Sequence, residues 1–184
     1  MAGVSTEERS WQPEEMSDFL TEMERAVPAL RRYARALLRD ADGADDLVQS
    51  TLERALSRRR LWRRDGSLRA WLYTILRNIH RNELRARARR PTLVAVDLDE
   101  IGPGRPGDQI DRVYLGEVLG ALDRLSQDHR EVLLLAGVEE LSYREIAAVV
   151  GVPIGTVMSR LSRARDALAG HLEGDEATRL RRVK

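Results

Sequence analysis

The stretch Ser142–Leu168 constrains the fold of this chain most, because it holds two helical repeats separated by residues that end one helix and start another. Gly151 can adopt the left-handed conformation that ends a helix, and Pro153 suits the first turn of the next one. Apolar residues recur at helical spacing on both sides of this turn: Tyr143, Ile146, Ala147 and Val150, then Val157, Leu161, Ala164 and Leu168. We therefore predict two short helices packed across a tight turn.

The opposite side of the second predicted helix carries hydroxyl and guanidinium groups. These residues are Thr156, Ser159, Arg160, Ser162 and Arg163. In the major groove, arginine can bind guanine through two hydrogen bonds, and serine or threonine can bond base edges or phosphates. We interpret this helix as a candidate recognition helix for DNA, with an ordinary hairpin bearing a solvated basic face as the alternative.

The composition favours an all-α protein. The 184 residues include one phenylalanine, six prolines and no cysteine, and the abundant leucine and alanine are typical of helices. The absence of cysteine excludes disulfides, thiolate metal sites and a cysteine nucleophile. No apolar run approaches the ~20 residues of a membrane span, and no signal-peptide pattern starts the chain. We expect a cytoplasmic protein without membrane insertion.

Charge is distributed very unevenly along the chain, although the net charge is only +1. Residues 58–90 carry 12 basic and 2 acidic side chains, a net charge of +10. Residues 1–57 carry −5, residues 91–111 carry −4, and residues 112–184 are neutral overall. A concentrated basic block indicates an anionic partner such as nucleic acid.

Five segments are expected along the chain. Two helical domains, each with its own core, are flanked by polar segments and joined by a flexible acidic linker containing the sequence GPGRPG. The segments are a disordered amino terminus at 1–13, a helical domain at 14–90, the linker at 91–111, a four-helix domain at 112–172 and a polar tail at 173–184.

Local signals divide the first domain into helices. Pro28 interrupts a helical pattern that continues to Leu38, so a kink or a new helix is expected there. Asp42 is expected to cap the next helix and Ser67 the third. The third helix has an apolar stripe, and its other side bears polar and aromatic residues: Tyr73, Arg77, Asn78, His80, Arg81 and Arg85.

An arginine-rich loop connects the second and third predicted helices. It reads SRRRLWRRDGS and includes Arg60, Trp62 and Arg63. Single-stranded nucleic acid needs cations along its phosphates and flat side chains on which bases stack. Trp62 could equally be a lid over the core, with the arginines solvated, and the sequence leaves both interpretations open.

Catalysis is not indicated. His80, His129 and His171 are isolated from one another in the sequence, and neither a metal-ligand spacing nor a Ser/His/Asp arrangement is apparent. We expect no enzymatic activity, no metal and no cofactor.

Three stretches together resemble one family. They are ADDLVQSTLERAL at Ala44–Leu56, SLRAWLYTILRNIHRNELR at Ser67–Arg85 and LSYREIAAVVGVPIGTVMSRLSRARDAL at Leu141–Leu168. From about Met16 to Leu172, the chain resembles bacterial RNA polymerase sigma factors of the extracytoplasmic-function (ECF) group. The resemblance implies a sigma-2-like domain and a sigma-4-like helix-turn-helix domain, joined by a flexible linker.

The resemblance also implies roles for individual residues. The helix Ala44–Leu56 would dock on the β′ clamp helices of core RNA polymerase, with the β flap as a second polymerase contact. The polymerase-binding residues would be Asp45, Asp46, Gln49 and Glu53. The minus-ten element would be bound by Arg60, Trp62, Arg63, Arg77, Asn78, Arg81 and Arg85, and the minus-thirty-five element by Thr156, Ser159, Arg160, Ser162 and Arg163.

The function implied is promoter recognition, strand opening and transcription initiation at a specific, stress-responsive set of genes. Family members are usually restrained by an anti-sigma factor, so one is expected here. One alternative is a conventional helix-turn-helix regulator that binds duplex DNA without polymerase. Another is an RNA-binding or adaptor protein that uses the arginine block.

Overall fold

The computed structural model describes residues 11–63, 66–89 and 109–182, and within them every regular element is helical. The described residues contain no strand, which confirms the all-α prediction. The expected linker lies almost entirely outside the described residues, as do residues 1–10 of the expected disordered terminus. The elements are α1 (Pro13–Leu38), α2 (Ala41–Ser57), the 3-10 turn η1 (Arg59–Leu61), α3 (Leu68–Arg89), α4 (Gln109–Asp123), α5 (Gln127–Gly137), α6 (Tyr143–Val150) and α7 (Ile154–Arg182).

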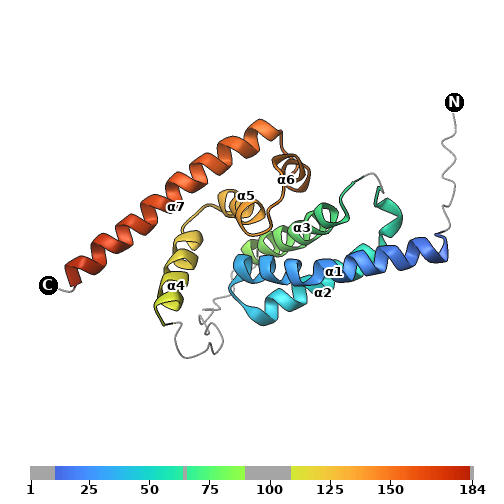
Figure 1. Ribbon diagram of the computed structural model, residues 1–184, viewed down its shortest axis with the longest axis horizontal. Helices are drawn as coiled ribbons and strands as arrows, with labels where there is room; N and C mark the ends of the chain where they lie inside the picture. Colours follow the sequence, from blue (N-terminus) through green and yellow to red (C-terminus); the bar gives the residue numbers. More distant parts are fainter. Residues whose placement is uncertain (1–10, 64–65, 90–108, 183–184) are drawn as a thin grey trace.

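The first three helices form one bundle. α1 and α2 lie side by side as a helical hairpin, and α3 packs on both of them (Figure 1). The apolar stripe expected in the third helix is buried there, with Leu68, Leu72 and Leu76 at most 1% exposed. This bundle therefore presents α2 on one outer side and α3 toward the second half of the chain.

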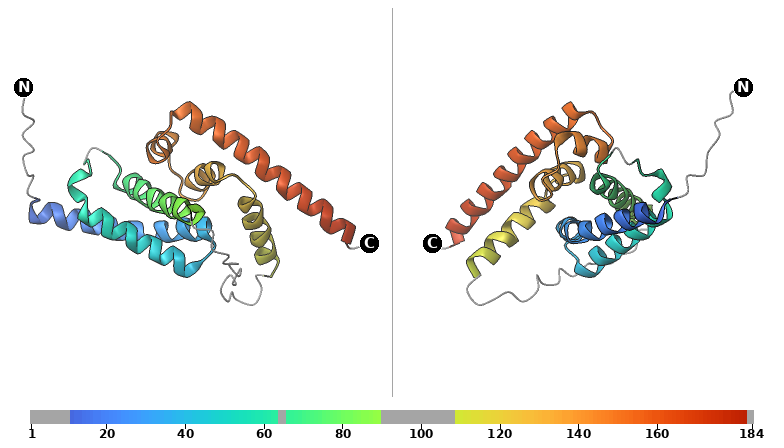
Figure 2. Two further views of the ribbon diagram at one scale, coloured as in Figure 1. Left: turned by 180° about the vertical axis from the view of Figure 1, so that it is seen from behind. Right: turned by 45° about the vertical axis from the view of Figure 1, so that its right-hand side comes forward.

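The last four helices form the second body. α7 packs against α4, α5 and α6, and its carboxy-terminal part runs alongside α4 beyond the other two helices (Figure 2). The polar tail expected after residue 172 continues this helix to Arg182. The two bodies also touch, because α5 packs on α1 and α6 packs on α3, and their buried side chains form one continuous cluster.

Of the two options left open at Pro28, the structure excludes the start of a new helix, and it also moves the cap of the second helix. Pro28 lies inside the single helix α1, where the buried residues Met23 and Leu30 on either side of it keep one continuous packed stripe. The cap of α2 is Asp40, whose carboxylate accepts from the backbone N–H of Asp42 at 3.1 Å. The chain already reverses at Arg39, which has a φ of 56°, so the helix starts before Asp42.

The predicted turn between α6 and α7 is present, and the two helix axes are bent by 99°. Gly151 has a φ of 70°, and its N–H donates to the carbonyl of Ala147 at 2.9 Å. Ser142 and Glu145 cap each other's backbone N–H groups at the start of α6. Tyr143 was expected in the buried stripe, but it is 38% exposed because it lies at the first position of the helix, ahead of the packed turn.

Replacing Gly151 by alanine is expected to reduce the free energy of unfolding by about 1–2 kcal/mol, because a side chain disfavours the left-handed conformation. Its Cβ would meet nothing within 4 Å, so backbone strain alone would produce the loss. Gly170→Ala in α7 also fills open space, but there alanine should stabilise by up to about 1 kcal/mol. Urea denaturation of both variants measures the two changes in the free energy of unfolding. A change of the same sign in both variants would contradict the prediction.

Candidate nucleic-acid interface

The outer face of α7 presents the predicted recognition residues in part. Ser159, Ser162 and Arg163 are exposed, and Thr156 is half-buried. On the opposite side, Val157, Leu161 and Ala164 are at most 1% exposed and anchor the helix in the second body. The predicted division of this helix into a buried arc and a polar arc is confirmed by these exposures.

Arg160 of this predicted set is held by a neighbour within the second body. Its Nη2 lies 2.7 Å from Oδ2 of Asp128 in α5. Asp128 also contacts Arg81 of α3. Burial alone raises the pKa of Asp128, but the hydrogen bond from Arg81 and the charge of Arg160 outweigh it and hold that pKa below its usual range. The carboxylate therefore stays ionised between two arginines.

The predicted polymerase-binding residues lie on the exposed side of α2. Asp46, Gln49 and Glu53 are exposed and follow one another by three and four residues, so they share one helix face. The Gln49 amide donates to Oε1 of Glu53 at 3.0 Å. Asp45 points toward α1, where its carboxylate lies 3.0 Å from Nε of Arg31. Three of the four residues therefore form one open polar surface.

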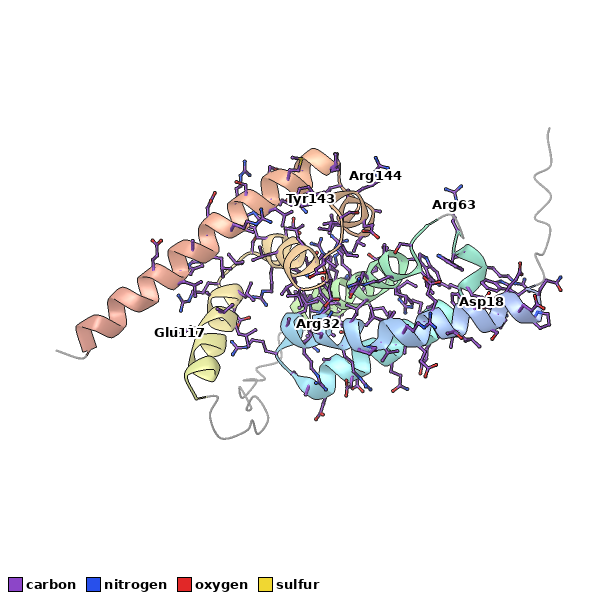
Figure 3. All side chains as sticks on the ribbon, in the orientation of Figure 1. Asp18, Arg32, Arg63, Glu117, Tyr143 and Arg144 are labelled. Atoms are coloured by element: carbon purple, nitrogen blue, oxygen red, sulfur yellow. The ribbon has the colours of Figure 1, made fainter. Side chains whose placement is uncertain are left out.

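Trp62 is half-buried in an aromatic cluster rather than exposed in its loop. Its ring centroid lies 5.6 Å from that of Phe19 and 6.3 Å from that of Trp11, on which it stacks. Trp11 falls in the segment expected to lack structure, but it packs here. The flanking Arg63 projects away from the helices (Figure 3), and Arg60 is also exposed. In this structure Trp62 covers the core, which was one of the two open interpretations.

The basic face of α3 is divided. Asn78 and Arg85 are exposed, whereas Arg77 is 8% exposed and buried under α5. Arg77 Nε donates to Glu131 Oε2 at 2.7 Å, and Arg81 donates to both carboxylate oxygens of Glu131 at 2.9 Å. Two predicted minus-ten residues are thus paired with an acid of the second body.

A second acid, Glu139, lies in the loop after α5 and has no exposed side-chain surface. Arg32 of α1 donates to its two oxygens at 3.1 and 3.0 Å; Figure 3 labels Arg32 close to where α1 passes α5. From α3, Arg69 donates to Oε2 at 2.9 Å and to the backbone carbonyl at 2.7 Å. The Tyr73 hydroxyl donates to the same Oε2 at 2.6 Å.

The side chains of Tyr73 and His80 on α3, close to Glu139 and Glu131, are buried and neutral. Burial, together with the hydrogen bond to Glu139, raises the pKa of Tyr73, so the hydroxyl remains a donor. Burial also lowers the pKa of His80, against the opposing charge of Glu131. His80 lies on the polar side of the helix, as expected, but α5 and its acids cover this side of α3, and the residue is 5% exposed.

Glu131 and Glu139 were not singled out from the sequence. A signal was available for Glu131, because it lies three and four residues before the buried Leu134 and Leu135, on the packed side of α5. An acid in such a stripe needs a buried partner. For Glu139, a loop residue, no periodic signal exists.

Neither a metal-binding cluster nor a single membrane-spanning helix is found among the described residues. No cluster of three or more histidine, cysteine, aspartate or glutamate side chains in 11–63, 66–89 and 109–182 could hold a metal ion. None of the described helices alone is long and apolar enough to cross a membrane, and among them only α6 and α7 taken together, bent by 99°, reach that length and composition.

Family models assign both halves of the chain to the same class of protein. The Sigma2 domain of PhyR matches residues 23–77, and sigma-70 region 4 matches residues 115–168. The ECF RNA polymerase sigma factor EcfG of Rhodopseudomonas palustris is 42% identical over 152 residues, which cover 83% of each chain. The ECF RNA polymerase sigma factor SigC of Mycobacterium tuberculosis is 37% identical over 78% of this chain and 77% of its own.

This chain belongs to the ECF sigma factors of bacterial RNA polymerase. Solved structures are similar as well. The Bartonella quintana sigma factor RpoE, in complex with the anti-sigma factor NepR, has a TM-score of 0.75 and 38% identity, covering 85% of this chain and 98% of its own. CnrH, in complex with the cytosolic domain of CnrY, has a TM-score of 0.65 and 28% identity, covering 87% and 90%.

The conventional helix-turn-helix regulator considered from the sequence is excluded by these matches. Such a regulator would account for residues 115–168 but not for the sigma domain matched at 23–77.

Proposed function

We propose that this chain is the promoter-specificity subunit that core RNA polymerase recruits for a particular set of genes, and that an anti-sigma factor controls it. The observation that carries the proposal is the order of two sigma modules in one chain, supported by relatives that cover most of its length. The chain would catalyse no reaction itself, because the polymerase supplies the chemistry, and it would act in the cytoplasm.

Core polymerase would be bound through the exposed face of α2. Asp46, Gln49 and Glu53 supply carboxylate and amide groups there, which suit a basic and polar partner such as the β′ clamp helices. Asp45 would support this surface from its edge, through its pairing with Arg31. The second body would contact the β flap.

Promoter DNA would be contacted by both bodies. Ser159, Ser162 and Arg163 on the open face of α7 would bind the minus-thirty-five element as duplex, with Thr156 and Arg160 at its edges. The minus-ten element would be opened and held by α3 and the η1 loop. Its contacts would be Arg60, Trp62, Arg63, Arg77, Asn78, Arg81 and Arg85.

An anti-sigma factor is the third proposed partner. The similar proteins RpoE and CnrH were both solved with a second protein bound, which in the case of RpoE is the anti-sigma factor NepR. At 38% identity and nearly full coverage, RpoE supports a partner of the same kind for this chain.

Run-off transcription with purified bacterial core polymerase tests the proposal. The wild-type chain should produce promoter-dependent transcripts that core enzyme alone does not. The double variant Gln49→Ala/Glu53→Ala should bind core polymerase about 10- to 100-fold more weakly, as for the loss of interface hot spots. Glu24→Ala, an exposed acid on α1, is the matched control and should bind normally. A core enzyme that initiates identically with and without the chain would refute the proposal.

A further inference from the structure

We propose that three acids of the second body form an acidic latch that replaces promoter phosphates on α3 and keeps the free chain closed. The acidic latch consists of Asp128, Glu131 and Glu139, together with the donors that they contact on α1 and α3. The regulatory meaning of this contact rests on the function proposed above for Arg77 and Arg81. The closed geometry is independent of that function and can be tested separately.

The latch and nucleic acid need the same donor groups. Glu131 accepts from Arg77 Nε at 2.7 Å and from Arg81 Nε and Nη2 at 2.9 Å. A phosphate is bound by the same guanidinium N–H groups that bind a carboxylate. Glu131 is 1% exposed and Arg77 8% exposed, and the carboxylate of Glu131 already accepts from Nε of Arg77 and from Nε and Nη2 of Arg81. Engagement of DNA by Arg77 and Arg81 and closure by Glu131 therefore exclude each other.

Asp128 extends the latch to the recognition helix. Its carboxylate contacts Arg81 of α3 and, at 2.7 Å, Arg160 of α7. The Asp128 carboxylate thus pairs with one candidate DNA-binding arginine in each body, Arg81 in the first and Arg160 in the second. Displacement of α5 from α3 would free Arg81 and would leave Arg160 with a half-exposed, replaceable partner.

Glu139 determines how the second body is positioned on the first in the closed state. Three donors from two helices converge on this carboxylate: Arg32 of α1 with two hydrogen bonds, and Arg69 and Tyr73 of α3. Paired hydrogen bonds from a guanidinium fork impose geometry as well as attraction. The carboxylate can satisfy these donors in only one arrangement of the two bodies, so it sets how the second body lies on the first.

Burial makes such a contact exchangeable rather than permanent. The free energy needed to remove two ions from water is nearly as large as the free energy of their attraction. A buried ion pair therefore contributes little to the net free energy of closure. An anion of similar geometry, such as a phosphate, can therefore take over the arginines at little net cost. A closed and an open state separated by a small free energy are what a partner can shift by binding one of them preferentially.

The first experiment measures closure directly, by energy transfer between two dyes. The chain has no cysteine, so Glu24→Cys on α1 and Ala169→Cys on α7 give two unique labelling sites at exposed positions. In this labelled parent, Glu131→Gln/Glu139→Gln removes both buried charges while keeping side-chain size. The transfer efficiency should fall. Glu140→Gln, the same change at the exposed neighbouring residue, should leave it unchanged.

Circular dichroism shows whether the double variant keeps its helices. If the helix signal is retained and the transfer efficiency does not fall, the latch is refuted. If the helix signal is lost, Tyr73→Phe decides instead, because it removes only the hydroxyl that donates to Glu139 at 2.6 Å. A lower transfer efficiency for Tyr73→Phe supports the latch, and an unchanged one overturns it.

The second experiment measures access to α3, using a short mixed-sequence single-stranded DNA oligonucleotide as the probe. If the closed state makes up at least about nine-tenths of the free chain, opening should raise the apparent affinity about tenfold or more. Adding Arg77→Gln and Arg81→Gln to the open variant should abolish this gain. Equal affinity of the open variant and Glu140→Gln would overturn the occlusion of α3.

Failure of the latch and failure of the proposed function give different results. If the chain supports run-off transcription but the charge-removing variants do not change the transfer efficiency, the proposed function stands and the latch is refuted. If the variants open as expected but the chain does not bind core polymerase, the latch stands and the proposed function is refuted. If both the latch and the proposed function are correct, adding core polymerase to the labelled wild-type chain should lower the transfer efficiency.

Discussion

Replacing Leu161 by alanine is expected to lower the free energy of unfolding by about 2–5 kcal/mol, as for other buried leucines. Leu161 is 1% exposed and packs within the second body. For a chain of this size, each kcal/mol corresponds to roughly 2–4 °C in melting temperature, so the change is large enough to follow by circular dichroism. Leu72→Ala, with Leu72 fully buried in the first body, should cost a similar amount.

The matched control for this loss is Arg163→Ala, two residues along the same helix. Arg163 is exposed, and surface substitutions usually change stability by no more than about 0.5 kcal/mol. The two variants therefore separate a residue that maintains the fold from one whose role is at the surface. A stability loss for Arg163→Ala as large as that for Leu161→Ala would overturn this division.

Arg163→Ala should instead reduce the discrimination between matched and mutated minus-thirty-five sequences by about 1–3 kcal/mol, the usual contribution of a two-bond arginine contact to a base. The exposed guanidinium on the open face of α7 is placed for such a contact. Competition binding of the holoenzyme to the two sequences measures the loss. Equal weakening on both sequences would exclude base readout by Arg163.

Arg165→Ala provides the comparison for a phosphate contact. Arg165 is also exposed on α7, at the edge of the polar arc. Its loss should weaken binding to all sequences alike and reduce the slope of log affinity against log salt by about 1. Specificity and salt dependence therefore distinguish the two arginines, even though both variants bind DNA less tightly.

Helical periodicity was enough to predict the parts of the fold held together by short-range packing. The buried arc of Val157, Leu161 and Ala164 and the stripe of α3 follow from spacing alone, because apolar residues on one side of a helix must be covered. The turn at Gly151 was equally predictable, since few residues other than glycine adopt a positive φ.

Part of the polar side of α3 is buried, for a physical reason that the sequence does not reveal. Tyr73, Arg77 and His80 look like an exposed face in sequence, but they are 8% exposed or less. Their burial depends on Glu131 and Glu139, which lie more than fifty residues further along the chain. Such pairing leaves no periodic trace on either segment, so only the three-dimensional arrangement reveals it.

The packing of Trp62 on Phe19 and Trp11 has a spectroscopic consequence. All three tryptophans of the chain, at positions 11, 62 and 71, precede residue 90, so indole emission originates entirely in the α1–α3 bundle. Far-ultraviolet ellipticity, in contrast, arises from the helices of both bodies, α1 to α7 in the described part of the chain. Any difference between the two optical melting curves therefore measures how independently the sigma-2-like and sigma-4-like bodies unfold.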